Sequence, residues 1–172
     1  MIISVASGKG GTGKTTVSVN LAASLETPLK LLDCDVEEPN VHLFIQPEEM
    51  VSRTESTFVP VIDEQRCNGC RKCADLCEFN ALAVIGEKVL VFPELCHSCE
   101  GCGEICPEQA VRSGSRELGT VETGSWHHVT MSYGRLRVGE AMSPPLIARV
   151  QSIIDPDDLV IIDAPQALRV RP

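Results

Sequence analysis

The segment from Cys67 to Cys106 contains one cysteine pattern twice. Both copies follow the spacing CxxCxxCxxxC and are offset by 29 residues. Regularly clustered thiols in a chain whose N-terminus does not read as a secretory signal are typical of metal binding rather than of disulfides. The segment is therefore expected to fold around metal, and the isolated Cys34 is expected to be a small buried residue. The stretches CNGCRKCADLC and CHSCEGCGEIC supply Cys67, Cys70, Cys73, Cys77, Cys96, Cys99, Cys102 and Cys106.

The pattern resembles that of two-cluster bacterial ferredoxins, over about residues 61–112. The resemblance implies an α+β domain with two 4Fe–4S clusters, in which the fourth cysteine of each run serves the other cluster. Zinc is the competing interpretation, because CxxC pairs also suit a tetrahedral Zn²⁺ site. Glu78 stands where the ferredoxin pattern has a proline, and we expect this to affect chain direction or cluster potential rather than ligation. The implied ligand sets are Cys67, Cys70, Cys73 and Cys106 for one cluster, and Cys96, Cys99, Cys102 and Cys77 for the other.

A glycine-rich loop, SGKGGTGKTT at residues 7–16, follows the apolar stretch at residues 1–6. Gly8 to Thr15 fits the pattern GxxxxGK(S/T), whose glycines allow successive backbone N–H groups to turn toward phosphate oxygens. Lys14 would supply positive charge at the β- and γ-phosphates, and the Thr15 hydroxyl is a candidate Mg²⁺ ligand. A helix that begins after this loop would also direct its positive end at the anion. The segment predicts a nucleoside triphosphate site.

The second lysine of the loop, Lys9, is similar to the additional lysine of the MinD, ParA and Mrp family of ATPases, whose loop reads KGGxGKTT. The resemblance implies ATP with Mg²⁺, and a homodimer through the nucleotide face in which Lys9 reaches the nucleotide of the partner subunit. A cation there would offset charge as the γ-phosphate leaves. The alternative is an exposed loop lysine. The implied nucleotide-binding residues are Gly8, Lys9, Gly10, Gly11, Thr12, Gly13, Lys14, Thr15, Thr16 and Asp163.

Two acidic strand ends also resemble this family. LLDCDVEEPN is similar to its second strand and first switch, which implies that Asp35 positions the attacking water or a Mg²⁺-bound water and that Asp33 closes the strand. LVIIDAP is similar to the strand that carries the Walker B acid, which implies that Asp163 holds a water of the magnesium shell. An aspartate at a strand end is also consistent with a simple cap. The implied catalytic residues are Lys9, Lys14 and Asp35.

The order of elements predicts an α/β fold with a parallel sheet. A strand at residues 1–6, a helix at 15–25 with Val17, Leu21 and Leu25 on its apolar face, and a second short strand before Asp35 form a βαβ unit. Residues 36–56 read as loop and a short helix, 57–62 as a strand, and 88–92 as a hairpin strand. A later helix is expected from Ser143 as its cap. The prediction is a P-loop NTPase core in two parts, residues 1–60 and 113–172, around the ferredoxin-like domain at 61–112.

The C-terminal stretch DAPQALRVRP departs from the family pattern, because Gln166 stands where a glycine of the second switch is expected. We therefore expect a truncated chain with an incomplete P-loop core, in which edge strands lack neighbours.

Charge and hydropathy exclude some function classes. The formal net charge is −9 and no cluster of Lys and Arg is visible, which argues against a general nucleic-acid binder. No apolar run approaches the roughly 20 residues that span a bilayer. We expect a soluble cytoplasmic protein without a membrane span or a nucleic-acid partner.

The two motifs together predict an ATP-binding and ATP-hydrolysing protein that couples nucleotide state to electron transfer through two 4Fe–4S clusters. Two alternatives stay open. One is an electron carrier whose nucleotide domain is inactive, and the other is an iron–sulfur cluster scaffold or carrier. The redox partner or client protein is not identified by the sequence.

Overall fold

The computed structural model describes residues 1–165, and Gln166, where the sequence departs from the family pattern, lies outside the described residues. Within the described part, the chain forms two compact units. Unit 1 comprises Met1–Glu55 and the residues from Leu118 onward, and unit 2 comprises Ser56–Glu117. No helix among the described residues has the length and apolar character needed to cross a membrane.

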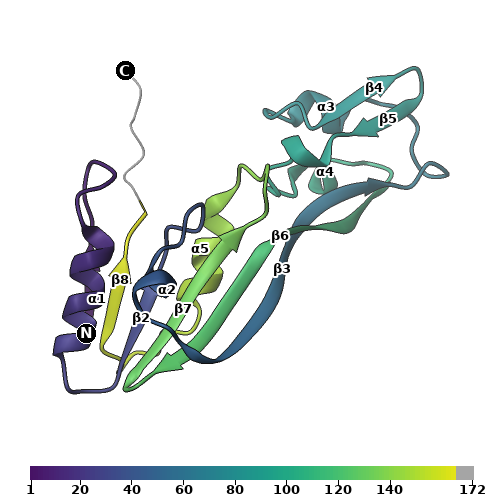
Figure 1. Cartoon of the computed structure of the whole chain (residues 1–172). Coiled ribbons are helices and arrows are strands. Elements are labelled where there is room, and N and C mark those ends of the chain that lie inside the picture. Colours follow the sequence, from purple (N-terminus) through teal and green to yellow (C-terminus); the bar gives the residue numbers. More distant parts are fainter. Residues whose placement is uncertain (166–172) are drawn as a thin grey trace. The chain divides into compact units, whose positions relative to one another are not determined.

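Unit 1 is built on a mainly parallel sheet, shown in Figure 1. Strand β8 pairs in parallel with β1 on one side and with β2 on the other, and β2 also pairs in parallel with β7. β6 and β7 form an antiparallel pair joined at His127 and His128. This sheet confirms the expected α/β class. Its order within the described residues is β1 (Ile2–Val5), β8 (Val160–Asp163), β2 (Leu29–Asp33), β7 (Val129–Leu136), β6 (Val111–Trp126) and β3 (Glu48–Ile62).

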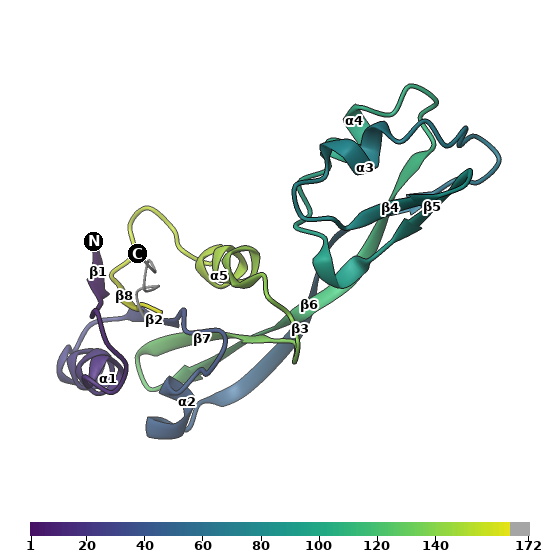
Figure 2. The same cartoon turned by 90° about the horizontal axis from the view of Figure 1, so that it is seen from above.

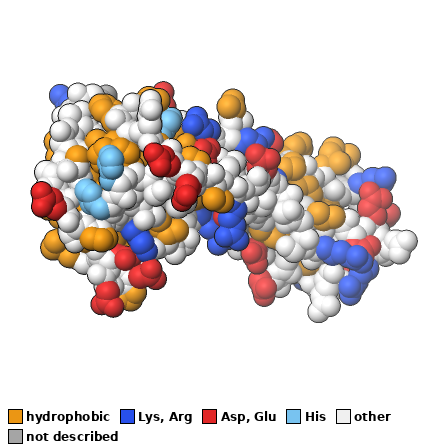
Figure 3. Space-filling view, turned by 60° about the horizontal axis from the view of Figure 1, so that its bottom comes forward, with side chains coloured by type: hydrophobic (Ala, Val, Ile, Leu, Met, Phe, Trp, Pro, Cys, Tyr) orange, Lys and Arg blue, Asp and Glu red, His pale blue; other side chains and the backbone are white. Residues whose placement is uncertain are grey.

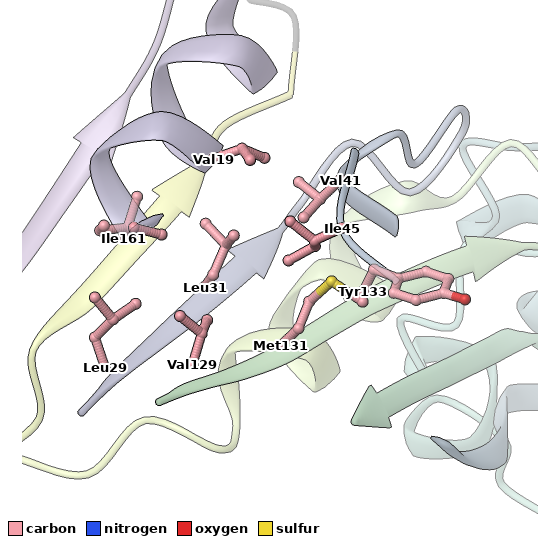
Figure 4. Close-up of a cluster of buried hydrophobic side chains, with 10 residues drawn as sticks. Val19, Leu29, Leu31, Val41, Ile45, Val129, Met131, Tyr133 and Ile161 are labelled. Carbon is pink, nitrogen blue, oxygen red and sulfur yellow. The ribbon is translucent and has the colours of Figure 1, made fainter. Parts of the chain in front are cut away.

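Helices cover both faces of this sheet. α1 (Lys14–Ser24) and α2 (Val41–Phe44) lie on one face and α5 (Ser143–Gln151) lies on the other, as Figure 2 shows. Alternate residues of β2 serve the two cores, because successive side chains of a strand point to opposite faces. Leu29 and Leu31 join the cluster drawn in Figure 4, whereas Leu32 packs with the α5 side chains Leu146 and Val150.

Two helix details differ from the sequence prediction. Val17, expected on the apolar face of α1, is 55% exposed, while Val19 and Ala22 are buried against the sheet. At about 100° per residue, Val19 and Ala22 lie on one side of the helix and Val17 turns away from it. Ser143 is the first residue of α5 and not its cap; Met142 holds that position and makes no side-chain capping bond.

The longest strands have the weakest strand pattern in the sequence. Residues 48–56, read as loop and short helix, belong to the 15-residue strand β3, and the short helix is confined to α2. The first seven residues of β3 are all exposed, so they show no alternation of apolar and polar residues. Pairing with β6, rather than burial, accounts for the strand. Both β3 and β6 contribute residues to the two units.

Unit 2 contains an antiparallel hairpin and short helices between the cysteines. The hairpin pairs Leu82 with Val91, and Leu82 is buried with Cys73 and Cys102 in a small core of this unit. Partly buried apolar side chains, among them Phe58, Ile62 and Val111, pack against this core. The elements are α3 (Lys72–Leu76), β4 (Leu82–Ile85), β5 (Lys88–Val91), the 3₁₀ turn η1 (Pro93–Leu95) and α4 (Gly101–Glu104).

The molecular surface has mixed charge. On the face drawn in Figure 3, acidic and basic side chains occur in small separate groups among hydrophobic and uncharged ones. This distribution fits a chain with 15 Lys and Arg residues against 24 Asp and Glu residues.

Candidate functional site

The glycine loop lies between β1 and α1, as its sequence predicts. Gly11 and Gly13 have positive φ angles of 69° and 88°, a conformation that glycine adopts at little cost. A Cβ atom added at either position would meet no protein atom within 4 Å, so the loop faces open space. The Ser7 hydroxyl donates to the Lys9 carbonyl at 2.7 Å, and the Thr12 hydroxyl donates to the Ser7 hydroxyl at 2.7 Å. These bonds fix the loop while its concave side stays open.

Parallel pairing brings the acidic strand ends to this loop. Asp163 pairs with Val5 of β1 and with Asp33 of β2, so the carboxyl ends of all three strands share one edge of the sheet. In open α/β sheets this edge is where ligands bind. The Thr15 hydroxyl donates a hydrogen bond of 2.6 Å to Asp163 Oδ2. This length is typical of an O–H donor with an ionised acceptor.

Asp163 is also the most unusual polar group of this edge. The residue is 1% exposed, and its Oδ1 atom has no hydrogen-bond partner among the described residues. A buried carboxylate oxygen without a donor is costly unless a ligand or water satisfies it. The Thr15 hydroxyl donates its hydrogen bond to Asp163, so the lone pairs of the hydroxyl oxygen remain available to a cation. A hydrated Mg²⁺ beside Thr15 fits both features, because hard cations take oxygen ligands and keep bound waters.

Asp33 has a structural role at the same edge. Its carboxylate accepts backbone N–H groups of Asp35, Asn40 and Val41 at 3.0, 2.7 and 3.0 Å. Complete burial raises the pKa of Asp33 to about 6, although these three donors oppose the rise. The carboxylate thereby holds the segment from Asp35 to α2 in place, which is more than the strand closure expected of it.

Asp35 stands at the start of this segment. Its pKa is raised by partial burial, and the nearby Lys14 ammonium opposes that rise. Asp35 and Lys14 line the same pocket, which has a volume of about 590 Å³. Pockets for small ligands typically measure about 300–1,000 Å³. The pocket is lined by Gly10, Gly11, Thr12, Gly13, Lys14, Thr15, Thr16, Asp35, Glu38, Asn40, Leu43 and Phe44.

Some residues of this nucleotide pocket were not predicted. Leu43 and Phe44 of α2 are 70% and 56% exposed and face the glycine loop across the pocket, and the sequence offers no pattern that marks them. Glu38 also lines the pocket and was not predicted. Conversely, Lys9 is exposed and does not line the pocket of the described chain.

The eight clustered cysteines gather around two pockets of unit 2. The first, here called site 1, is lined by Cys67, Cys70, Cys73 and Cys106, together with Asn68, Arg71, Lys72 and Glu108. The second, here called site 2, is lined by Cys77, Cys96, Cys99 and Cys102, together with Glu78, His97, Glu100 and apolar residues; Cys73 also reaches its edge. Each pocket therefore takes three cysteines from one run and the last cysteine of the other run.

The clustered cysteines are free thiols, and two of the buried ones have raised pKa values. All nine cysteines are free. Burial raises the pKa of Cys102 to about 11, with the neighbouring Cys96 adding to the rise, and it also raises the pKa of Cys73. A thiol held this way ionises readily only with a cationic metal or cluster beside it. Among the described residues, no three His, Cys, Asp or Glu side chains converge on a single-ion site.

Cys34 and three histidines have ordinary places. Cys34 is completely buried, as expected, and burial raises its pKa to about 11. His97 is exposed and stacks on Phe79 with ring centroids 3.5 Å apart. His127 and His128 form the turn between β6 and β7, and His128 Nε2 lies 3.3 Å from the Ala22 carbonyl oxygen.

Comparison with known families agrees with this geometry. Residues 1–70 match the ParA family model, described as the NUBPL iron-transfer P-loop NTPase, and residues 59–107 match a 4Fe–4S dicluster domain. The chain thus carries a ParA-type P-loop NTPase domain and a 4Fe–4S dicluster domain, which confirms both resemblances drawn from the sequence.

Individual relatives align with most of the chain or with a part of it. Two proteins of Methanocaldococcus jannaschii, both named as uncharacterised, are 33% identical over 96% of this chain and 28% identical over 88% of it. The chain spans only 59% and 55% of the lengths of these two relatives. An iron–sulfur cluster carrier protein of Deinococcus radiodurans is 47% identical over 58 residues, which is 31% of this chain and 17% of that protein.

Proposed function

We propose that the chain binds and hydrolyses ATP in the nucleotide pocket and couples its nucleotide state to electron transfer through two 4Fe–4S clusters at sites 1 and 2. The observation that carries the proposal is the pair of four-cysteine pockets in a chain that also has a phosphate-binding loop. The proposed boundaries are residues 61–112 for the cluster domain, with residues 1–60 and 113–172 forming the nucleotide part.

The nucleotide part of the proposal rests on residues that the fold brings together. The backbone of Gly10 to Thr16 would hold the phosphates, with Lys14 at the β- and γ-phosphates. Mg²⁺, when bound, would neutralise phosphate charge. Thr15 would be its ligand, and the unpartnered Oδ1 of Asp163 would accept a hydrogen bond from a water of its shell. Asp35, which lines the pocket, would orient the attacking water.

Lys9 is proposed to act across a homodimer. Within one chain Lys9 is exposed and does not line the described pocket. This position is expected of a residue that serves a second subunit. The proposed dimer would bury the nucleotide faces together, which places Lys9 near the γ-phosphate of the partner's nucleotide and stabilises charge in the transition state.

The cluster part of the proposal rests on ligand number. Each site offers four thiols, which is the full complement for a 4Fe–4S cluster, and such clusters carry one electron at a time. A full set of protein ligands favours clusters that stay in place, and therefore electron transfer. Nine free thiols also suit the reducing cytoplasm, where we place the protein.

The test separates the two parts. Lys14→Gln should weaken ATP binding, and Lys9→Gln should leave binding intact while lowering kcat by about 10²-fold or more. Lys88→Gln, an exposed lysine of β5, is the matched control and should change neither. Phosphate release and nucleotide titration provide the readouts. Absence of hydrolysis by the cluster-loaded protein, with no effect of Lys14→Gln on ATP binding, would refute the ATPase part.

A second candidate is an iron–sulfur cluster carrier. It is favoured by the relatives named as iron–sulfur cluster carrier proteins, which align with this chain over 67 and 58 residues. The two functions differ in an assay that mixes loaded protein with an apo-ferredoxin. Cluster transfer that requires ATP supports the carrier, whereas clusters that remain bound and are reversibly reduced by dithionite support electron transfer.

A further inference from the structure

The two cysteine sites are structural repeats of each other, so residues 29 positions apart occupy equivalent places. In each repeat the last cysteine accepts an N–H bond from the alanine four residues later, at 3.4 Å for Cys77 and 3.3 Å for Cys106. Arg71 and Glu100 are such equivalents. Both directly precede a short helix, with φ angles of 69° and 61°. Because the backbones are alike, differences between the sites must come from side chains.

The side chains that line the two sites differ in charge. Site 1 has Arg71 and Lys72 against Glu108, whereas site 2 has Glu78 and Glu100. With His97 neutral, the lining charges sum to +1 at site 1 and −2 at site 2.

Hydrogen bonds near the sites change this contrast only in part. At site 2 the Arg116 guanidinium donates to the Cys96 carbonyl at 3.0 Å, which brings one positive charge close to that site. At site 1 Glu108 accepts a hydrogen bond from the Asn68 amide at 3.1 Å. Even with Arg116 counted, site 1 remains the more positive of the two.

Charge of this kind sets how readily a site accepts an electron. Reduction makes the bound group more negative, so neighbouring cations favour the reduced form and neighbouring anions oppose it. Apolar side chains line both sites, with Ile62, Val89 and Val111 at site 1 and Phe58, Leu76 and Phe79 at site 2, so the charges are what distinguish the two sites.

One contact acts in the opposite direction. The Ser98 N–H donates to Cys96 Sγ at 3.4 Å, a bond at site 2 that favours the reduced form. The effect of a single neutral donor on a sulfur atom is weaker than the effect of a full charge of opposite sign. The charges therefore decide which site has the higher reduction potential.

We propose that site 1 has the higher reduction potential and site 2 the lower, and that the opposed charges of Arg71 and Glu100 account for much of the difference. The first electron that enters unit 2 therefore resides at site 1, and electrons move from site 2 to site 1. This inference rests on the proposed function, because it requires both clusters.

The experiment is a redox titration of the cluster-loaded chain followed by electron paramagnetic resonance. Arg71→Gln should lower the higher midpoint potential and leave the lower one in place, and Glu100→Gln should raise the lower one. Each should change the reduced-to-oxidised ratio of its site by about threefold to tenfold, where tenfold corresponds to 59 mV for one electron. Arg53→Gln removes the same charge from an arginine of unit 1 that is 82% exposed, and should move neither.

A charge exchange completes the test. The double variant Arg71→Glu/Glu100→Arg keeps the net charge and should narrow or invert the gap between the two potentials. The inference is overturned if the unaltered chain shows one midpoint for both sites, if Arg71→Gln lowers the lower midpoint, or if the exchange leaves the gap unchanged. Iron analysis is made on every sample. A chain that takes up zinc instead of about eight irons overturns the proposed function itself and not merely the order of the sites.

Discussion

The hydrogen bond between Thr15 and Asp163 allows the nucleotide site to be tested without nucleotide. Thr15→Val keeps the shape of the side chain but removes the only proton that the structure directs at Asp163 Oδ2 among the described residues. The carboxylate is 1% exposed and its other oxygen already has no partner. A hydrogen bond to a charged group contributes about 1.5–3 kcal/mol, so we expect the free energy of unfolding of unit 1 to fall by about 2 kcal/mol.

The assay follows from the composition of unit 1. Trp126 is the only tryptophan of the chain and packs against the core of unit 1, so its fluorescence during urea unfolding reports this unit. Thr15→Ser is the control, because it keeps the hydroxyl and removes one methyl group, for a cost below about 1 kcal/mol. Asp163→Asn completes a double-mutant cycle, in which the coupling energy isolates the pair.

The same variants then test the magnesium site. Thr15→Val should weaken the Mg²⁺-dependent part of ATP binding by at least about tenfold, whereas Thr15→Ser should retain it. Equal stability of Thr15→Val and the unaltered chain would show that the hydrogen bond makes no contribution. Mg²⁺-dependent affinity that survives Thr15→Val would rule out the hydroxyl as a ligand.

Three further outcomes are expected. Gly134→Ala should destabilise unit 1 by about 1–3 kcal/mol, because the added Cβ would lie 2.7 Å from Val36 Cγ1; urea unfolding measures this. Lys30 forms ion pairs with Asp158 and Asp155, which raise the pKa of Lys30, and the pKa of Asp158 is lowered in turn. A carboxyl group with a lowered pKa stabilises the fold at pH values above its ordinary pKa near 3.8, and this stabilisation is lost as the pH falls through the lowered pKa. Lys30→Met should therefore flatten the decline in the urea midpoint between about pH 6 and pH 3. Removal of iron by a chelator should increase amide hydrogen exchange in the hairpin of unit 2 and leave the parallel strands of unit 1 protected.

Much of the nucleotide site could be predicted because its chemistry is local in sequence. The glycine loop carries its own backbone requirement, visible at Gly11 and Gly13, and it lies between a strand and a helix as the motif needs. Asp35 and Asp163 could be placed beside it because both follow apolar strands, and parallel strands end at one edge. Leu43 and Phe44 could not be predicted, since exposed apolar residues in a four-residue helix follow no periodicity.

The antiparallel part of the sheet was harder to predict from the sequence, for a related reason. Alternation along a strand appears only where one face is buried. The first half of β3 is exposed on both faces, so nothing in its sequence distinguishes it from loop. The turn at His127 and His128 also lacks the Asn-Gly or Asp-Gly signal of a two-residue hairpin, although His127 adopts a positive φ of 51°.

The cysteine repeats could be predicted from the sequence only in part. Their resemblance to the two-cluster ferredoxin pattern predicted two four-thiol sites, and Arg71 and Glu100 could be aligned by counting 29 residues. Counting does not show that these side chains line the pockets, because a residue next to a ligand cysteine can equally point to solvent. The left-handed backbone at both positions, which directly precede α3 and α4, gives the two side chains matching places with opposite charges. The repeat duplicates the cysteine ligands but not the charges beside them, so the two sites have the same ligands and different reduction potentials. A difference in reduction potential gives electron transfer between the two sites a direction.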